Sequence, residues 1–236
     1  MTVIPAGSAR DESRETGYLS DLLEGYRFRT AESEEDVESV LAVRRVCYGK
    51  YDVPIPDEYD QRSWFLMAEC KDTGRTVGTI RITPRSEGPM ELEEYFAVPD
   101  RLKRDDVVEM TRFAILPEYR KSSSGMPRVT FGLFKMVPAF MTAIGGHYIC
   151  VSSTPQQAKV YSWLGFVGTG VSAAYRKLDN KMHELFMWDL RHGFGPYDTQ
   201  QFYSWFVEWK SREILLPDGR PPFVAPRLDH TAVREG

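Results

Sequence analysis

The sequence predicts a mixed α/β fold. Segments in which apolar residues recur every second position, as in strands, follow segments in which they recur about every 3.6 positions, as in helices. Residues 26–30 alternate polar and apolar side chains, as a half-buried strand does. Residues 34–48 carry apolar residues at helical spacing. Ser33, with Asp36 three residues on, is a pair typical of a helix start. Further strand and helix patterns alternate up to residue 190. This succession is typical of a sheet with helices packed against it.

The remaining strands and helices are expected in alternation along the rest of the chain. The strand before Pro117 must end there, because proline has no N–H to donate to a sheet. Glycines, prolines and an Asp-Asn turn separate the later elements. The expected strands lie at 63–69, 76–83, 107–116, 147–152, 170–178 and 182–190, and the expected helices at 127–143, 155–164 and 199–212.

The composition of the 236 residues argues against several classes of function. A formal charge of −4 and a pI near 5.7 do not suit general nucleic-acid binding, which needs a surplus of Lys and Arg. Three widely spaced cysteines without a Cys/His cluster support neither a disulfide framework nor a metal site. No apolar run of about 18 residues and no secretory signal is visible. We therefore expect a cytoplasmic protein without integral membrane insertion.

Three regions differ in composition. Residues 1–16 are polar and charged, so we expect a flexible N-terminal segment. Residues 17–194 contain the alternating strands and helices and are expected to form the main domain. Residues 195–236 hold the aromatic-rich helix and a proline-rich tail. We expect this C-terminal extension to pack on the same domain.

Two ionised residues, Glu109 and Arg112, lie within the apolar strand expected at 107–116. Burying an unpaired charge is costly, so these residues need partners or a chemical task. Residues three apart in a regular strand face opposite sides of the sheet. The two side chains therefore share one pocket only if the strand contains a bulge. A purely structural ion pair is the alternative.

A basic, hydroxyl-rich loop follows this strand and leads into the helix expected at 127–143. Backbone N–H groups and the dipole at a helix N-terminus favour a bound anion such as phosphate. A solvated basic surface is the alternative interpretation. The residues expected to bind the anion are Arg120, Lys121, Ser122, Ser123 and Gly125.

Two segments resemble the GNAT-fold acyltransferases. The first is ILPEYRKSSSG followed by a helix, and the second is PQQAKVYSWLGF at 155–166. The resemblance covers about residues 26–190. It implies an α/β (α+β) fold with a mixed, mostly antiparallel central sheet flanked by helices. It also implies that the bound anion belongs to a phosphopantetheine thioester, the acyl donor.

A narrower resemblance points to the branch that contains acyl-homoserine-lactone synthases and long-chain N-acyl amino acid synthases. It rests on GTIRITP at 78–84 and EMTRF at 109–113, with Asp57 and Asp60 upstream. Autoinducer synthases carry a Trp and a Phe after the first helix, where they help to order the S-adenosylmethionine pocket. This chain has CYGKY at 47–51 instead. The resemblance therefore favours a free amino acid as acceptor over S-adenosylmethionine.

The chemistry of acyl transfer and the resemblance together give each candidate residue a role. Glu109 is the expected general base that leaves the attacking amine neutral. Arg112 and Tyr161 complete the catalytic set. Tyr161 would protonate the leaving thiolate, with a packing aromatic as the alternative. The backbone amides of Phe113, Ala114 and Ile115 are expected to bind the thioester carbonyl. Arg81, Asp57 and Asp60 are expected to bind the acceptor, and Arg81 is expected to form an ion pair with Asp57, Asp60 or a substrate carboxylate.

These expectations describe an N-acyltransferase that moves a medium-chain or long-chain acyl group from a phosphopantetheine thioester to the amino group of an amino acid. No tightly bound cofactor is expected. The aromatic helix either packs in the core or lines an acyl-chain tunnel. The alternatives are an acyl-homoserine-lactone synthase that uses S-adenosylmethionine, an acetyl-CoA-dependent N-acetyltransferase, and a non-catalytic acyl-binding sensor.

An acyl carrier protein is the favoured donor. Such carriers are acidic, so a basic docking surface whose binding weakens with salt is expected on this chain. Its candidate residues are Arg101, Lys103, Arg104, Arg120, Lys121 and Arg128.

Overall fold

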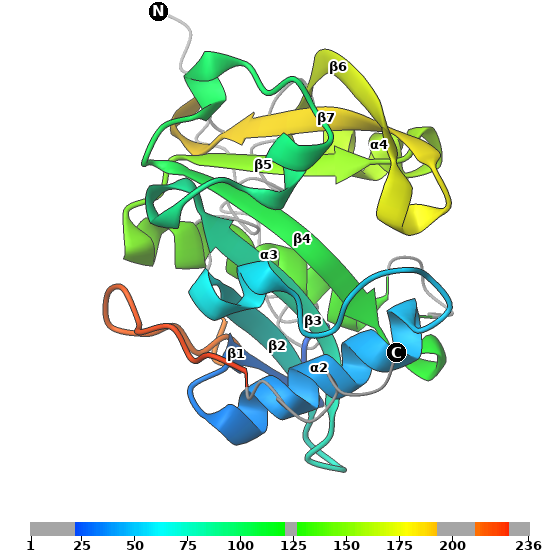
Figure 1. The fold of residues 1–236 in the computed structure, drawn as a ribbon. Coiled ribbons are helices and arrows are strands. Elements are labelled where there is room, and N and C mark those ends of the chain that lie inside the picture. The colour runs from blue at the N-terminus through cyan, green and yellow to red at the C-terminus, as the bar shows by residue number, and fades with distance from the viewer. Residues whose placement is uncertain (1–21, 121–126, 193–210, 227–236) are drawn as a thin grey trace, which may run out of the picture.

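The computed structural model describes residues 22–120, 127–192 and 211–226. Its centre is a seven-stranded sheet with the strand order β1-β2-β3-β4-β5-β7-β6, with helices on both faces (Figure 1). Only β4 and β5 pair in parallel, and the other neighbours are antiparallel. The predicted fold class is confirmed. The strands are β1 (Tyr26–Thr30), β2 (Trp64–Cys70), β3 (Thr76–Pro84), β4 (Val107–Ile115), β5 (Tyr148–Ser153), β6 (Val167–Tyr175) and β7 (Lys181–Asp189).

Different helices cover the two faces of the sheet. On one face, α2 (Glu34–Tyr48) packs its apolar stripe against Phe65 and Met67 of β2. On the other face, α3 (Arg128–Ile144) contacts β1, β2 and β3, while α4 (Pro155–Trp163) contacts β5, β6 and β7 (Figure 1). The predicted bounds of α2 agree with the structure. No helix in the described ranges combines the length and the apolar composition needed to cross a lipid bilayer.

The segment between β3 and β4 was not predicted. It contains three short 3-10 helices within residues 85–102, among them Glu91–Glu94. Met90, Leu92 and Phe96 are buried there in a second apolar cluster, together with Leu185 of β7. This cluster holds the segment on the same face of the sheet as α2 (Figure 1). The segment therefore covers the middle of β4.

Residues 211–226 return to the first strand. The amide of Phe28 donates to the carbonyl of Glu213 at 2.7 Å, and the amide of Leu215 donates to the carbonyl of Phe28 at 2.8 Å. Phe223 packs on Trp64, with ring centroids 4.6 Å apart. This segment lies beside β1 in Figure 1. The predicted N-terminal segment 1–16, and residues 199–210 of the predicted aromatic helix, lie outside the described residues.

The parallel pair β4 and β5 separates after only three residue pairs. Residues 107–109 pair with 148–150, but β4 continues to Ile115 and β5 to Ser153. Figure 1 shows the two strands diverging from this shared end. Within the described ranges, the inner edge of β4 therefore has no neighbouring strand beyond Glu109.

Candidate active site

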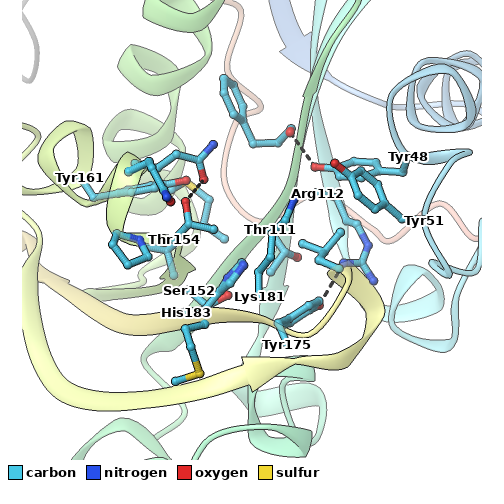
Figure 2. Close-up of a pocket in the computed structure, with 18 residues that line it drawn as sticks. Tyr48, Tyr51, Thr111, Arg112, Ser152, Thr154, Tyr161, Tyr175, Lys181 and His183 are labelled. Carbon is cyan, nitrogen blue, oxygen red and sulfur yellow. Dashed lines mark hydrogen bonds between the residues drawn. The ribbon is translucent and has the colours of Figure 1, made fainter.

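A cavity of about 690 Å³ opens where β4 and β5 separate. Its walls come from the end of α2, from β4 and β5, from the start of α4 and from the β6–β7 hairpin (Figure 2). The residues that line it are Tyr48, Tyr51, Met110, Thr111, Arg112, Phe113, Val151, Ser152, Thr154, Pro155, Gln156, Gln157, Tyr161, Tyr175, Leu178, Lys181, Met182 and His183.

A β-bulge at Arg112 sets the direction of its side chain. Arg81 of β3 pairs with Thr111 and Thr79 pairs with Ala114, so two residues of β4 face the single residue between them on β3. Arg112 is the first of these two and has φ of 52°. A left-handed conformation is uncommon for a residue with a side chain. Here the bulge turns Arg112 toward the face on which Arg81 lies.

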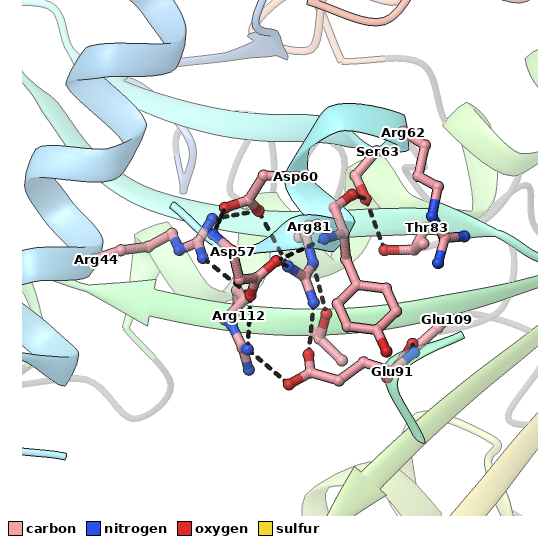
Figure 3. A network of polar contacts seen from close by, with 12 residues as sticks. Arg44, Asp57, Asp60, Arg62, Ser63, Arg81, Thr83, Glu91, Glu109 and Arg112 are labelled. Carbon is pink, nitrogen blue, oxygen red and sulfur yellow. Dashed lines mark hydrogen bonds and ion pairs between the residues drawn. The ribbon is translucent and has the colours of Figure 1, made fainter. Parts of the chain in front are cut away.

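Arg81 is the centre of a buried ionic network (Figure 3). Its Nη1 lies 2.5 Å from Asp57 and 3.0 Å from Asp60, and its Nη2 lies 2.6 Å from Glu91. Its Nε donates to the hydroxyl of Thr111 at 3.1 Å. The side chain of Arg81 is fully buried. An arginine in this position is satisfied only because each part of its guanidinium has an acceptor.

Arg112 and Arg44 extend the same network. Arg112 Nη2 lies 2.8 Å from Asp57 and 2.7 Å from Glu91, and Arg44 Nη1 lies 2.7 Å from Asp60. Tyr175 donates its hydroxyl to Glu91 at 2.7 Å and accepts from Arg112 Nη1 at 3.3 Å. The three guanidinium groups thus face three carboxylates, two from the 3-10 helix Glu58–Arg62 and its cap and one from the segment between β3 and β4 (Figure 3).

The arginines keep these carboxylates ionised. Burial alone would raise the pKa values of Asp57 and Glu91, but Arg81 and Arg112 hold both pKa values well below their usual range. An opposite charge at hydrogen-bond distance favours the charged form of a carboxyl group. Arg112 is therefore a permanent cation at the wall of the cavity.

Glu109 lies beside this network rather than in the cavity. Its two carboxylate oxygens accept the backbone N–H groups of Glu91 at 2.7 Å and of Leu92 at 3.2 Å. It is 1% exposed, and among the described residues no ion pair joins it to an arginine. Burial and the nearby Glu91 carboxylate raise the pKa of Glu109 to about 8. Glu109 and Arg112 are thus connected through Glu91 and not directly.

The three residues expected to bind the acceptor also lie behind the cavity wall. Asp57, Asp60 and Arg81 are bound to one another, and none of them lines the cavity. Asp57 caps the 3-10 helix Glu58–Arg62 and accepts the amide of Tyr59, which fixes the position of its carboxylate. Among the described residues, Arg81 contacts the cavity wall through the hydroxyl of Thr111, and Asp57 contacts it through Arg112.

The inner edge of β4 presents backbone groups to the gap. The amide of Leu116 donates to the carbonyl of Val77 in β3 at 2.9 Å. The backbone groups of successive strand residues point in alternating directions, so those of Ala114 face β3 and those of Phe113 and Ile115 face away from it. The carbonyl of Phe113 accepts the hydroxyl of Tyr48 at 2.7 Å. Of the three predicted amides, two therefore point into the gap.

The predicted phosphate loop is only partly described. Lys121, Ser122, Ser123 and Gly125 lie outside the described residues. Arg120 is described, and its Nε donates to the carbonyl of Ile115 at 2.6 Å. Arg128 is the first residue of α3 and is exposed. The loop therefore connects the open edge of β4 to the N-terminus of α3.

The described basic residues expected to form one docking surface lie at two ends of β4. Arg101, Lys103 and Arg104 precede the strand, whereas Arg120 and Arg128 follow it. A strand of nine residues is roughly 30 Å long. In addition, Arg104 Nη2 lies 2.7 Å from Asp106. Only the second group lies at the end of β4 that meets the cavity and α3.

Tyr161 lines the cavity from α4, as expected for a residue that contacts the donor. Its ring packs against Phe134, Phe166 and Phe186. Burial, with Tyr48 nearby, raises the pKa of Tyr161 above its usual value, so the phenol keeps its proton at neutral pH. Both predicted roles, in packing and at the site, are compatible with this position.

Sequence reasoning missed several residues that complete the site. Arg44 and Glu91 carry no local mark, because Arg44 follows an ordinary helical pattern and Glu91 is one of several neighbouring acidic residues. Tyr175 and His183 belong to a hairpin that was predicted, but their position at the cavity depends on the sheet topology. The separation of β4 from β5 also depends on the sheet topology, and no local pattern in the sequence marks it.

Comparison with known proteins agrees with this geometry. Residues 40–187 match the family of the N-acyl amino acid synthase FeeM. The chain belongs to this family. It is therefore an N-acyltransferase. No curated protein sequence matches the chain significantly.

Solved structures of the FeeM family and of autoinducer synthases share the fold. FeeM from uncultured soil microbes superimposes with a TM-score of 0.61 at 18% identity, over 70% of this chain and 90% of FeeM. The CoA-dependent acyl-homoserine lactone synthase BjaI, solved with SAM and isopentyl-CoA, gives 0.59 at 17% identity, over 87% of this chain and 96% of BjaI. TofI gives 0.54 at 14% identity, over 79% and 99%. At these identities the similarity establishes the fold.

Removing Arg81 should destabilise the protein strongly. Arg81→Met leaves Asp57, Asp60 and Glu91 buried with too few cations, which costs about 3–5 kcal/mol for a broken buried ion pair. Arg45→Met is the matched control, because Arg45 is exposed and pairs only with Glu38, and such pairs contribute up to about 1 kcal/mol. Urea unfolding measures both changes. Equal losses in the two variants would contradict the structural role of the network.

Glu109 should make the stability fall as the pH rises. Its pKa of about 8 in the folded protein lies above the unfolded value of about 4.3, so the folded state binds this proton more tightly. The free energy of unfolding should therefore decrease between about pH 5 and pH 8. Glu109→Gln should reduce this slope, as measured by urea unfolding at several pH values. A slope identical in both proteins would show that Glu109 does not titrate in this range.

Proposed function

We propose that this protein acylates the amino group of a free amino acid with a medium-chain or long-chain acyl group from a phosphopantetheine thioester. One observation carries the choice of acceptor. Among the described residues, the side chains that line the cavity include two cations, Arg112 and Lys181, and no carboxylate. A ligand with a net negative charge in its reactive form suits such a cavity.

The charge of the two possible acceptors differs at the moment of attack. An amino acid whose amine has lost its proton keeps one negative charge, on its carboxylate. S-adenosylmethionine in the same state carries a sulfonium cation as well and is neutral overall. Asp57 and Glu91 balance the charge of Arg112 from behind the wall, so the repulsion of a sulfonium ion in this cavity comes mainly from Lys181. The free amino acid is therefore the better acceptor.

Arg112 is the residue that we assign to the acceptor carboxylate. Its Nη atoms are held by Asp57, Glu91 and Tyr175. Its Nε is buried without a hydrogen-bond partner among the described residues. A buried donor of this kind gains about 1.5–3 kcal/mol from a hydrogen bond to a charged acceptor. In this proposal Glu109, Arg81, Asp57 and Asp60 act on the acceptor through Arg112, by fixing its orientation.

The donor is assigned to the gap between β4 and β5. The amides of Phe113 and Ile115 point into this gap and can polarise the thioester carbonyl, whose oxygen becomes negative in the tetrahedral intermediate. Met110 and Val151 form part of an apolar wall of the cavity, against which an acyl chain can pack. Tyr161 is assigned to protonate the leaving thiolate.

The phosphate end of the donor is assigned to the loop before α3. Its residues Lys121, Ser122, Ser123 and Gly125 precede the helix N-terminus, where backbone N–H groups favour an anion. An acyl carrier protein, docking at the Arg120 and Arg128 end of β4, is the favoured source of the thioester. Three free cysteines fit a reducing cytoplasm.

The acceptor class can be tested with purified protein. An acyl thioester is offered together with either a mixture of amino acids or S-adenosylmethionine, and mass spectrometry identifies the products. We expect N-acyl amino acids and no lactone. Lys181→Met should raise the KM for the amino acid about fivefold, since a half-exposed cation contributes about 1 kcal/mol. Lys159→Met in α4 is the matched control and should change nothing. Lactone formation from S-adenosylmethionine alone would refute the proposal.

The donor class can be tested by comparing an acyl carrier protein with acyl-CoA of the same chain length. Transfer from the acidic carrier should weaken as salt rises, because docking between opposite charges is screened. Arg128→Gln should lower kcat/KM for the carrier several-fold, whereas Arg101→Gln, at the other end of β4, should not. Faster transfer from acyl-CoA, with no effect of salt on the carrier reaction, would assign the protein to CoA donors.

A further inference from the structure

His183 in β7 is a titratable cavity residue to which the assignments above give no role (Figure 2). It is 6% exposed. Neither Nδ1 nor Nε2 has a hydrogen-bond partner among the described residues. A buried polar group without a partner costs about 1–3 kcal/mol, so such groups are rare in native proteins. The imidazole therefore calls for a ligand or a chemical task.

Few of the described residues of the cavity have buried polar atoms without a hydrogen bond. Of all the side chains that line it, only His183 and Arg112 have buried polar atoms without a hydrogen bond among the described residues. The other atoms of this kind belong to residues outside the cavity wall. An amino acid presents one carboxylate and one amine. The two unsatisfied residues of the cavity match this pair, with Arg112 suited to the carboxylate and His183 to the amine.

The surroundings of His183 keep its ring neutral. Its ring is stacked on Tyr175, with centroids 5.2 Å apart and planes inclined by 21°. Lys181 lies on the same strand, Arg112 and Glu91 lie beyond the hydroxyl of Tyr175, and β5 contributes the uncharged Ser152. Burial, and then the charge of Lys181, lower the pKa of His183. A neutral imidazole with a free lone pair can accept a proton at pH 7.

We propose that His183 is the general base that takes a proton from the ammonium group of the acceptor. An N–H bond of the ammonium breaks and an N–H bond forms on the imidazole, which leaves the amine with a lone pair. The amine then attacks the thioester carbonyl carbon, and the C–S bond breaks. The amine loses its second proton as the amide forms, and the thiolate gains one proton. One proton passes overall from His183 to solvent.

The position of His183 suits this step better than that of Glu109. Its ring borders the cavity, whereas both oxygens of Glu109 are bound to backbone N–H groups behind the wall. Arg112 and Lys181 also disfavour a further cation in the cavity, so they favour the neutral amine once the proton has passed from His183 to solvent. This inference needs only an amine acceptor, which the family establishes, and it holds for any amine.

His183→Gln tests the proposal, with His147→Gln at an exposed position before β5 as the matched control. We expect kcat/KM for an amino acid acceptor to fall at pH 7 by about 10²-fold, the usual contribution of a general base. The same variant should acylate hydroxylamine, which is already neutral at pH 7, within a few-fold of the unmodified protein. The pH profile should lose the acidic limb assigned to His183. His147→Gln should behave as the unmodified protein.

Two results would overturn the proposal. One is a His183→Gln variant that retains its rate on the amino acid within about threefold, well short of the usual contribution of a general base. The other is an equal loss on the amino acid and on hydroxylamine, which would indicate a structural role. Thermal unfolding verifies folding, and His183→Asn repeats the test if the first variant is unfolded. If the protein acylates a different amine and no amino acid, the proposed acceptor class fails, while the comparison with hydroxylamine still decides the role of His183.

Discussion

The cavity depends on the ionic contacts that hold Arg112 in its bulge. Asp57 and Glu91 bind the guanidinium of Arg112 from one side, and Arg81 binds the same two carboxylates from the other. Each charge is buried, so none is stable without the others. Because these residues come from β3, β4 and two loop segments, the requirement for neutrality fixes how these segments meet. The wall of the cavity is the outer surface of this arrangement.

The local part of the fold could be read from the sequence. The bounds of β1 and α2 agree with those expected, because an alternating pattern and a helical stripe are complete within a few turns of chain. The 3-10 helices between β3 and β4 have no such period. Their place is set by Met90 and Leu92, which are buried against residues far away in the chain. Such a segment has no repeating hydrophobic pattern from which its structure could be predicted.

Some features of the site could likewise be predicted from the local sequence, and others could not. Glu109 and Arg112 could be identified because a charge within an apolar strand is visible locally. Their relation could not be predicted, since it depends on a bulge in the register with β3 and on Glu91, which arrives from the irregular segment. The expected ion pairs of Arg81 with Asp57 and Asp60 are confirmed, but these residues, expected to bind the acceptor, lie behind the cavity wall. The sequence resemblance indicated that these residues matter for the site. It did not show that they lie behind the cavity wall and have no direct contact with the cavity.

The contact between β1 and residues 211–226 has a consequence for synthesis on the ribosome. Phe28 pairs with Ile214 and Trp64 packs on Phe223, so among the described residues this cover of β1 and Trp64 is made only after all seven strands. At about 5–20 residues per second, the chain from β1 to Ile214 takes roughly 10–40 s to make. An open strand edge is a template for pairing with other chains. The nascent protein is therefore more open to misassembly before residues 211–226 emerge than after.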